Sequence, residues 1–212
     1  MNGLAVPTEG STVESLAAMF EPEDARILAA ALEQFALTGV RRTSTDDIAR
    51  RAGVNRATLY RRLGTKDQIV GGAMVFEATR VLAEIDRQLH ALPDGVAAED
   101  FIVRFFVITQ ATLHTNPLLV QLLEVDRDET LFALTGKAGG ILTAASSYLA
   151  DRIREIRARA GLPSDDRVEA VAAAISRLSQ SLLLTPDGPP RVDTERARED
   201  FARAVLVPMI LG

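Results

Sequence analysis

Apolar side chains recur along this chain at intervals of three and four residues, the spacing that places them on one side of an α-helix. The first stripe precedes Gly39, a residue type that commonly ends helices. No segment alternates with a period of two for long enough to predict a β-strand. The pattern therefore predicts an all-α protein. The first stripe consists of Ile27, Leu28, Ala31, Leu32 and Phe35.

Two short helices are predicted within residues 45–63. Ser44 can cap the first helix, with Asp47 at the position that completes a capping box. Asn55 can cap the second helix, and Gly53 between the two tolerates a positive φ angle. Both helix starts are therefore marked in the sequence itself.

The junction of these two helices carries the residue types that a helix-turn-helix requires. Helices that cross at a tight turn need a small residue at the crossing, glycine in the turn and an apolar residue that anchors the second helix. Ala49, Gly53 and Leu59 meet these needs. The exposed side of the second helix then carries side chains suited to base edges and phosphates in a DNA major groove, namely Arg56, Ala57, Thr58, Tyr60 and Arg61.

A long helix is predicted next, opened by a capping box of Thr65 and Gln68 and ended near Ala91 by the sequence "LPDG". Residues 1–22 are rich in Gly, Ser, Thr, Pro and Glu and are predicted to form a flexible N-terminal extension. The stripe of the long helix consists of Ala73, Met74, Ala78, Val81, Leu82, Ile85 and Leu89. Further apolar-striped helices are predicted near 97–115, 118–124, 138–160, 168–184 and 194–211.

Charge is distributed unevenly along the chain, whose formal net charge is −5. Eight basic and two acidic residues lie between Arg41 and Lys66, so this segment carries +6 and the rest of the chain carries −11. A basic segment on an acidic body is expected of a protein that contacts a polyanion at one place. Because dense basic runs also occur on solvated surfaces, the spacing of the small and apolar residues is what favours DNA binding.

Composition excludes several other classes of protein. The absence of cysteine excludes thiol and disulfide chemistry, and neither His90 nor His114 lies in a metal-binding spacing, so we expect no metal, cofactor or enzymatic activity. The N-terminal sequence lacks the basic and apolar regions of a signal peptide. An uncharged run extends over residues 105–123 but contains polar residues and a proline that are costly in lipid. We therefore expect a cytoplasmic protein with no membrane contact.

The sequence from Thr43 to Val70, "TSTDDIARRAGVNRATLYRRLGTKDQIV", together with the helix before it, resembles the DNA-binding domain of the TetR family of transcriptional regulators. The rest of the chain is similar to the family only in its predicted architecture. The resemblance implies a three-helix helix-turn-helix DNA-binding domain over residues 23–66. It also implies a helical-bundle ligand-binding and dimerisation domain over residues 67–212.

The resemblance further implies roles for individual side chains in DNA binding. Where the family commonly has His-Phe, this chain has Arg62-Leu63, which retains a cation and an apolar anchor. The side chains expected near base edges are Arg56, Ala57 and Thr58. Those expected near phosphates are Thr43, Ser44, Thr45, Tyr60, Arg61, Arg62 and Lys66.

Residues that could line a ligand pocket are aromatic side chains with a few polar groups among them, which is the usual make-up of such a site. Each also has a plainer interpretation as part of the core, and His114 in particular is more simply a hydrogen-bonded core histidine. The acidic residues between 124 and 129 are interpreted as a solvated helix end rather than a metal site. The candidate pocket residues are Phe76, Phe105, Phe106, Gln110, His114 and Phe132.

The helices predicted at 168–184 and 194–211 have broad apolar sides, which often pack against a partner. In the family these helices form the dimer as a four-helix bundle around a two-fold axis. Packing within one chain is the alternative interpretation. The candidate dimer-interface residues are Val168, Val171, Ala172, Ile175, Leu178, Leu182, Phe201, Ala204 and Val205.

The resemblance implies a homodimeric transcriptional repressor that binds a palindromic operator in double-stranded DNA. A small apolar ligand in the C-terminal domain would release it. One alternative is a dimeric helical interaction protein whose basic stretch binds an acidic partner, which explains the charge but not the spacing of Ala49, Gly53 and Leu59. A second alternative is an all-α enzyme or metal protein, but the sequence lacks a nucleophile–base pair and a phosphate-binding loop.

Overall fold

The computed structural model describes residue 18 and residues 20–93, 95–163 and 166–212, and every element in those ranges is a helix. The all-α prediction is confirmed. Most of the predicted N-terminal extension, residues 1–17 and 19, lies outside the described residues. The helices form two compact units. The N-terminal unit extends through Arg80 and also contains Thr115–Ala144; the C-terminal unit contains Val81–His114 and Ala145–Gly212.

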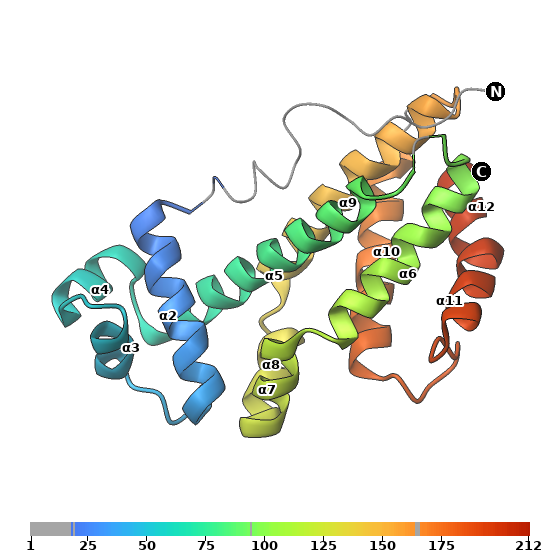
Figure 1. Cartoon of the computed structure of the whole chain (residues 1–212). Coiled ribbons are helices and arrows are strands. Elements are labelled where there is room, and N and C mark those ends of the chain that lie inside the picture. The colour runs from blue at the N-terminus through green and yellow to red at the C-terminus, as the bar shows by residue number, and fades with distance from the viewer. Residues whose placement is uncertain (1–17, 19, 94, 164–165) are drawn as a thin grey trace. The chain divides into compact units, whose positions relative to one another are not determined.

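The N-terminal unit is built around the apolar side of its first helix, beside which α3 and α4 lie in Figure 1. The stripe predicted for that helix is buried, and Ile48, Leu59, Leu122 and Ala133 pack into the same core. The helices of this unit are α2 (Pro22–Thr38), α3 (Thr45–Arg51), α4 (Arg56–Leu63), the first part of α5 (Lys66–His90), α7 (Pro117–Val125) and α8 (Arg127–Leu134).

The chain just before α2 packs on this core. The ring of Phe20 meets that of Phe76 edge-on, with 5.3 Å between the ring centroids. Aromatic pairs favour this T-shaped arrangement. The end of the predicted flexible extension is therefore packed, and α2 begins at Pro22, where proline is well suited to the first helical turn.

The C-terminal unit is a bundle in which α6 packs against α10, α11 and the end of the chain. The Phe106 ring lies 5.5 Å from the Phe201 ring, and Asp100 pairs with Arg203 at 2.8 Å. The helices of this unit are the second part of α5, α6 (Ala98–His114), most of α9 (Gly139–Arg159), α10 (Arg167–Leu184), α11 (Glu195–Phe201), the π-turn η1 (Ala202–Leu206) and α12 (Val207–Leu211).

Two elements differ from the prediction. The acidic segment after residue 124 is not merely a solvated helix end, because α8 begins at Arg127 directly after the break at Asp126. The single helix predicted over 194–211 contains the π-turn η1. Pro208 has no N–H to donate and its ring crowds the carbonyl four residues earlier, so the regular pattern of hydrogen bonds cannot continue through it.

A polar cluster lies inside the C-terminal unit, between α5 and α9. The Tyr148 hydroxyl donates to the Asp86 carboxylate at 3.0 Å, and Arg152 pairs with Asp86 at 3.6 Å and with Glu155 at 3.0 Å. Burial, together with the nearby Asp86 charge, raises the pKa of Tyr148. Burial also raises the pKa of Glu155. Sequence patterning gave no sign of this cluster, because Asp86 lies on α5 and the other three members lie on α9.

None of the described helices is both long and apolar enough to cross a membrane. Within the same ranges, no three acidic or histidine side chains gather in a way that could hold a metal ion.

Candidate nucleic-acid interface

The start of α3 is fixed by a reciprocal capping box, as the sequence predicts. The Asp47 backbone N–H donates to the Ser44 hydroxyl oxygen at 3.1 Å. The Asp47 carboxylate accepts from the Ser44 backbone N–H at 3.0 Å and from its hydroxyl at 2.6 Å. These hydrogen bonds from the Ser44 side chain and backbone, followed by the nearby Arg50 charge, hold the pKa of Asp47 below its ordinary value. The position and direction of α3 are therefore set at its N-cap, Ser44.

The turn between α3 and α4 has the predicted geometry. Gly53 has a φ angle of 65°, and the Val54 N–H donates to the Ala49 carbonyl at 3.0 Å. Leu59 is fully buried and anchors α4. The Asn55 side chain caps α4 by accepting from the Thr58 N–H at 2.8 Å. The Ala49–Gly53–Leu59 pattern thus places a short helix across α3 with one side facing outward.

The outward side of α4 carries Arg56 and Tyr60 one turn apart. The Arg56 guanidinium lies 5.3 Å from the centre of the Tyr60 ring and donates to its hydroxyl at 3.3 Å. The Tyr60 hydroxyl also lies 3.1 Å from the Thr45 hydroxyl. The hydrogen bond with Tyr60, then the charge of Asp46, raises the pKa of Arg56; the hydrogen bonds with Thr45 and Arg56 lower the pKa of Tyr60. A cation and a phenol are thereby held side by side on an exposed helix face.

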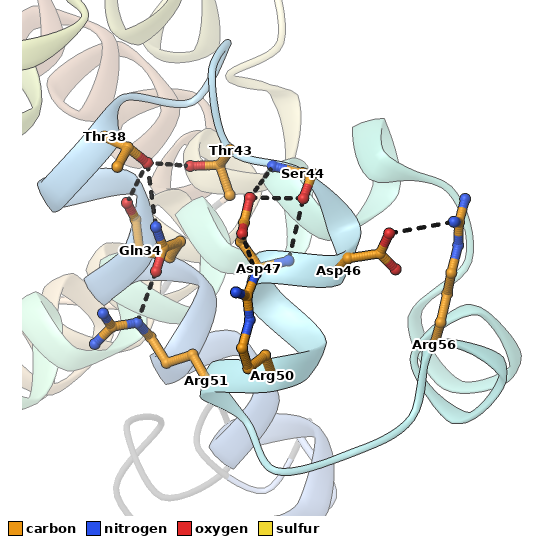
Figure 2. A network of polar contacts seen from close by, with 9 residues as sticks. All are labelled: Gln34, Thr38, Thr43, Ser44, Asp46, Asp47, Arg50, Arg51 and Arg56. Carbon is orange, nitrogen blue, oxygen red and sulfur yellow. Dashed lines mark hydrogen bonds and ion pairs between the residues drawn. The ribbon is translucent and has the colours of Figure 1, made fainter.

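Arg56 has a second partner on α3. Its Nη1 lies 3.3 Å from a carboxylate oxygen of Asp46, and Figure 2 shows the two side chains reaching toward each other from the two helices. The sequence did not identify Asp46 as part of the site. Its spacing from Arg56 has meaning only once the two helices are folded together.

The other predicted DNA-binding side chains differ in their exposure and in their polar partners. Ala57 and Arg61 are exposed, and Thr58 is half-buried. The Lys66 ammonium donates to the Arg41 carbonyl at 3.1 Å, and Arg62 pairs with Asp24.

Thr43 requires a correction. Its side chain is 1% exposed, and its hydroxyl donates to the Gly39 carbonyl at 2.7 Å. A group buried in this way cannot reach a phosphate, so the structure assigns Thr43 to the support of the α2–α3 loop. Thr45 is also buried, but its hydroxyl stays in contact with Tyr60.

Basic side chains around α3 are held by neighbouring polar groups, several of which Figure 2 draws. Arg50 pairs with Asp47, and Arg51 contacts Gln34 at 2.9 Å and Glu33 at 3.2 Å. Exposed pairs of this kind contribute little to stability, so these cations can exchange an acidic partner for a phosphate at low cost.

Asp126, at the junction of α7 and α8, holds the loop that leads into α3. Its carboxylate accepts from the Arg41 backbone N–H at 2.8 Å. Gly39 has a φ angle of 83°, and a side chain there would meet the Asp126 side chain at 2.9 Å. The start of the helix-turn-helix is therefore fixed by a residue 85 positions away in sequence.

Comparison with known proteins identifies the arrangement. The model of bacterial regulatory proteins of the tetR family matches residues 27–73, which span α2 to the start of α5. This segment of the chain is therefore similar to the DNA-binding part of tetR-family regulators. A repressor of this family, AlkX from Dietzia sp., has the same fold with a TM-score of 0.67 at 17% identity, over 90% of this chain and 96% of AlkX. The tetR-family repressor QsdR of R. erythropolis superposes with a TM-score of 0.65 at 19% identity, over 89% of this chain and 94% of QsdR.

The similarity to curated relatives is confined to part of the chain. The HTH-type transcriptional repressor Rv3405c of Mycobacterium tuberculosis is 42% identical over 67 residues, which are 32% of this chain and 34% of the relative. An HTH-type transcriptional regulator of Mycobacterium bovis, Mb3439c, matches to the same extent. The chain thus spans about a third of the length of these relatives.

The candidate pocket residues are distributed between the two units. Phe105, Phe106, Gln110 and His114 lie on α6 in the C-terminal unit, whereas Phe76 belongs to the N-terminal unit and packs on Phe20. Phe132 also belongs to the N-terminal unit and is 50% exposed, with the Lys137 ammonium 5.3 Å from its ring centre. An aromatic residue on an amphipathic helix does not reveal from sequence alone whether it faces the core.

Gln110 is the most informative of these residues. Its side chain is fully buried, and neither its amide nitrogen nor its amide oxygen has a hydrogen-bond partner among the described residues. The Gln110 backbone carbonyl oxygen lies 2.7 Å from Nδ1 of His114. Buried polar groups are normally paired, so this unpaired amide is an exception within the core of the unit.

Four of the predicted dimer-interface residues are buried within a single chain. Val168, Ala172, Ile175 and Leu182 are each less than 9% exposed, so a partner could not cover them further and the prediction is wrong for these positions. The apolar stripe of α10 fills the interior of its own unit. Ala204 is exposed, and Val171, Leu178, Phe201 and Val205 are half-buried.

Proposed function

We propose that this chain is a sequence-specific DNA-binding transcriptional repressor that acts in the cytoplasm. The observation that carries the proposal is the outward side of α4, where Arg56 and Tyr60 are held in contact on a capped and anchored helix. Helix-turn-helix proteins place such a second helix in the major groove. The repressor assignment is supported by the name of the 42% identical relative, Rv3405c.

In this proposal, residues 23–66 contact DNA. Arg56, Ala57 and Thr58 face base edges from the first turn of α4. Residues on both sides of that helix contact phosphates. Contacts to the DNA backbone fix the position of the protein on the duplex. The phosphate-facing residues are Ser44, Tyr60, Arg61, Arg62 and Lys66, with Thr45 positioning the Tyr60 hydroxyl.

The remaining residues, 67–212, would dimerise and bind the effector. Small side chains at Ala170, Ala174 and Ser181 occupy the exposed side of α10, and Ala204 and Pro208 are exposed at the end of the chain. Such small residues allow helices of two subunits to approach closely. A two-fold dimer would present two α4 helices to the two halves of a palindromic operator.

The effector would be a small apolar molecule with one polar group. The buried, unpaired amide of Gln110 supports this, because a ligand with both a donor and an acceptor would satisfy it. The ligand would release DNA by binding more tightly to a state of the dimer that does not fit the operator.

The test is selection of bound duplexes from a random pool, followed by fluorescence-anisotropy titration of the selected duplex and of a scrambled duplex of the same composition. Selective binding with a steep salt dependence is the expected result. Absence of binding to every duplex would contradict the proposal and favour a protein partner for the basic segment.

A further inference from the structure

The first turn of α3 contains two adjacent carboxylates with different partners. Asp47 is engaged in the capping box with Ser44. Asp46 takes no part in that cap, and its carboxylate instead faces Arg56 of α4 at 3.3 Å (Figure 2). Both side chains of this ion pair are 59% exposed. An exposed carboxylate in the most basic segment of the chain opposes binding to a polyanion, so its position calls for a reason beyond the helix cap.

Arg56 is held from both helices. It is the first residue of α4, where the positive end of the helix dipole disfavours a cation, and α4 has no acidic residue in its first turn. The compensating charge comes from Asp46. Tyr60 holds the guanidinium from the other direction, and Tyr60 is itself hydrogen-bonded to Thr45, the neighbour of Asp46. The four side chains form a series of contacts, Asp46–Arg56–Tyr60–Thr45, whose two ends are neighbours in sequence, and this series orients the guanidinium.

We propose that Asp46 determines sequence selectivity by holding Arg56 toward base edges and away from phosphates; this inference rests on the proposed DNA-binding function. A guanidinium has five N–H donors in a planar fork. Two can reach the N7 and O6 acceptors of guanine while another remains on Asp46. If the Arg56 guanidinium turned to a phosphate, its ion pair with Asp46 would break, and the phosphate would lie close to the negative charge of Asp46. Asp46 therefore weakens binding to non-operator DNA more than binding to the operator.

The test compares the wild type with Asp46→Asn, Arg56→Ala and the double variant on the selected duplex and the scrambled duplex. Asp46→Asn should tighten binding to the scrambled duplex about two- to fivefold, the range of one exposed ion pair. The selected duplex should gain less, so the selectivity ratio falls. The salt dependence on scrambled DNA should steepen by about 0.9 in log K per log salt, because Arg56 gains a phosphate.

Two further measurements separate this role from a general charge effect. In the Arg56→Ala background, Asp46→Asn should change both affinities by the same factor. Glu33→Gln is the matched control, because Glu33 is also an exposed acid paired with an arginine, Arg51 at 3.2 Å. It should leave the selectivity ratio unchanged.

An unchanged ratio for Asp46→Asn, or an equal fall for Glu33→Gln, would overturn the inference while the wild type still binds selectively. Failure of the wild type to bind any duplex would instead overturn the proposed function and this inference with it. Thermal unfolding of each variant, with an unchanged midpoint, ensures that the comparison concerns folded protein.

Discussion

At the scale of single residues, Ser44 controls the start of α3 through hydrogen bonds in both directions. Replacing Ser44 by Ala removes the acceptor for the Asp47 N–H and the donor to its carboxylate. We expect Ser44→Ala to lower the free energy of unfolding by about 1 kcal/mol, the usual value for a lost N-cap. Urea denaturation followed by circular dichroism measures this, and an unchanged midpoint would show that the cap contributes nothing.

The same cap has a pH signature. Because the pKa of Asp47 is lowered in the folded state, the ionised carboxylate stabilises the fold above the ordinary aspartate pKa of 3.8. That stabilisation is lost as the pH falls through the lowered pKa. Ser44→Ala removes the hydroxyl hydrogen bond that lowers it most and leaves the backbone N–H bond in place, so the stability of the variant should decline less steeply in acid than that of the wild type.

Gly39 offers a second prediction for a single residue. Its φ angle is 83°, and an added side chain would meet Asp126 at 2.9 Å. Gly39→Ala should therefore cost about 1–3 kcal/mol of stability from its backbone conformation alone. Gly71→Ala is the matched control, because it lies within α5 with nothing within 4 Å of the added carbon. It should stabilise the protein by about 0.5–1 kcal/mol through its higher helix propensity. Equal effects of the two substitutions, measured by thermal unfolding, would contradict this account.

At the scale of helices, the sequence predicted the features that depend on neighbouring residues, but not the contacts between segments distant in the chain. Ser44, Asn55 and Gly53 act on neighbours a few residues away, so their roles could be read from the sequence. The loop that leads into α3 depends on Asp126, whose carboxylate accepts from the Arg41 N–H 85 positions earlier. No pattern near residue 126 contains that information.

Apolar stripes also leave the direction of a helix undetermined. The apolar stripe predicted for α10 is present, but its buried residues face the interior of their own unit rather than a partner subunit. The pairing of Asp46 with Arg56 has the same origin, because it arises from the crossing of two helices. Sequence thus predicted the elements of the interface and most of its cations, but not the acid that orients Arg56.

At the scale of the whole molecule, dimerisation is predicted to use the small exposed residues of α10. Ala174→Arg should place a long charged side chain between the two subunits and shift the protein to monomers. Ala97→Arg, at another exposed alanine of the same unit, should leave the dimer intact. Light scattering at micromolar concentration measures both. If the Ala174→Arg variant remained a dimer, the interface would lie elsewhere on the molecule. If the wild type were a monomer, the prediction of a dimer would be wrong.

The central claim is that α4 reads DNA, with Arg56 at the bases and Tyr60 at the backbone. The most direct measurement is anisotropy titration of wild type, Arg56→Ala and Tyr60→Ala with the selected and scrambled duplexes. Tyr60→Ala should weaken binding to both by a similar factor. Arg56→Ala should in addition reduce the selectivity ratio by about tenfold, the discrimination expected of one bidentate base contact. If Arg56→Ala left both affinity and sequence preference unchanged, α4 would not be the recognition helix.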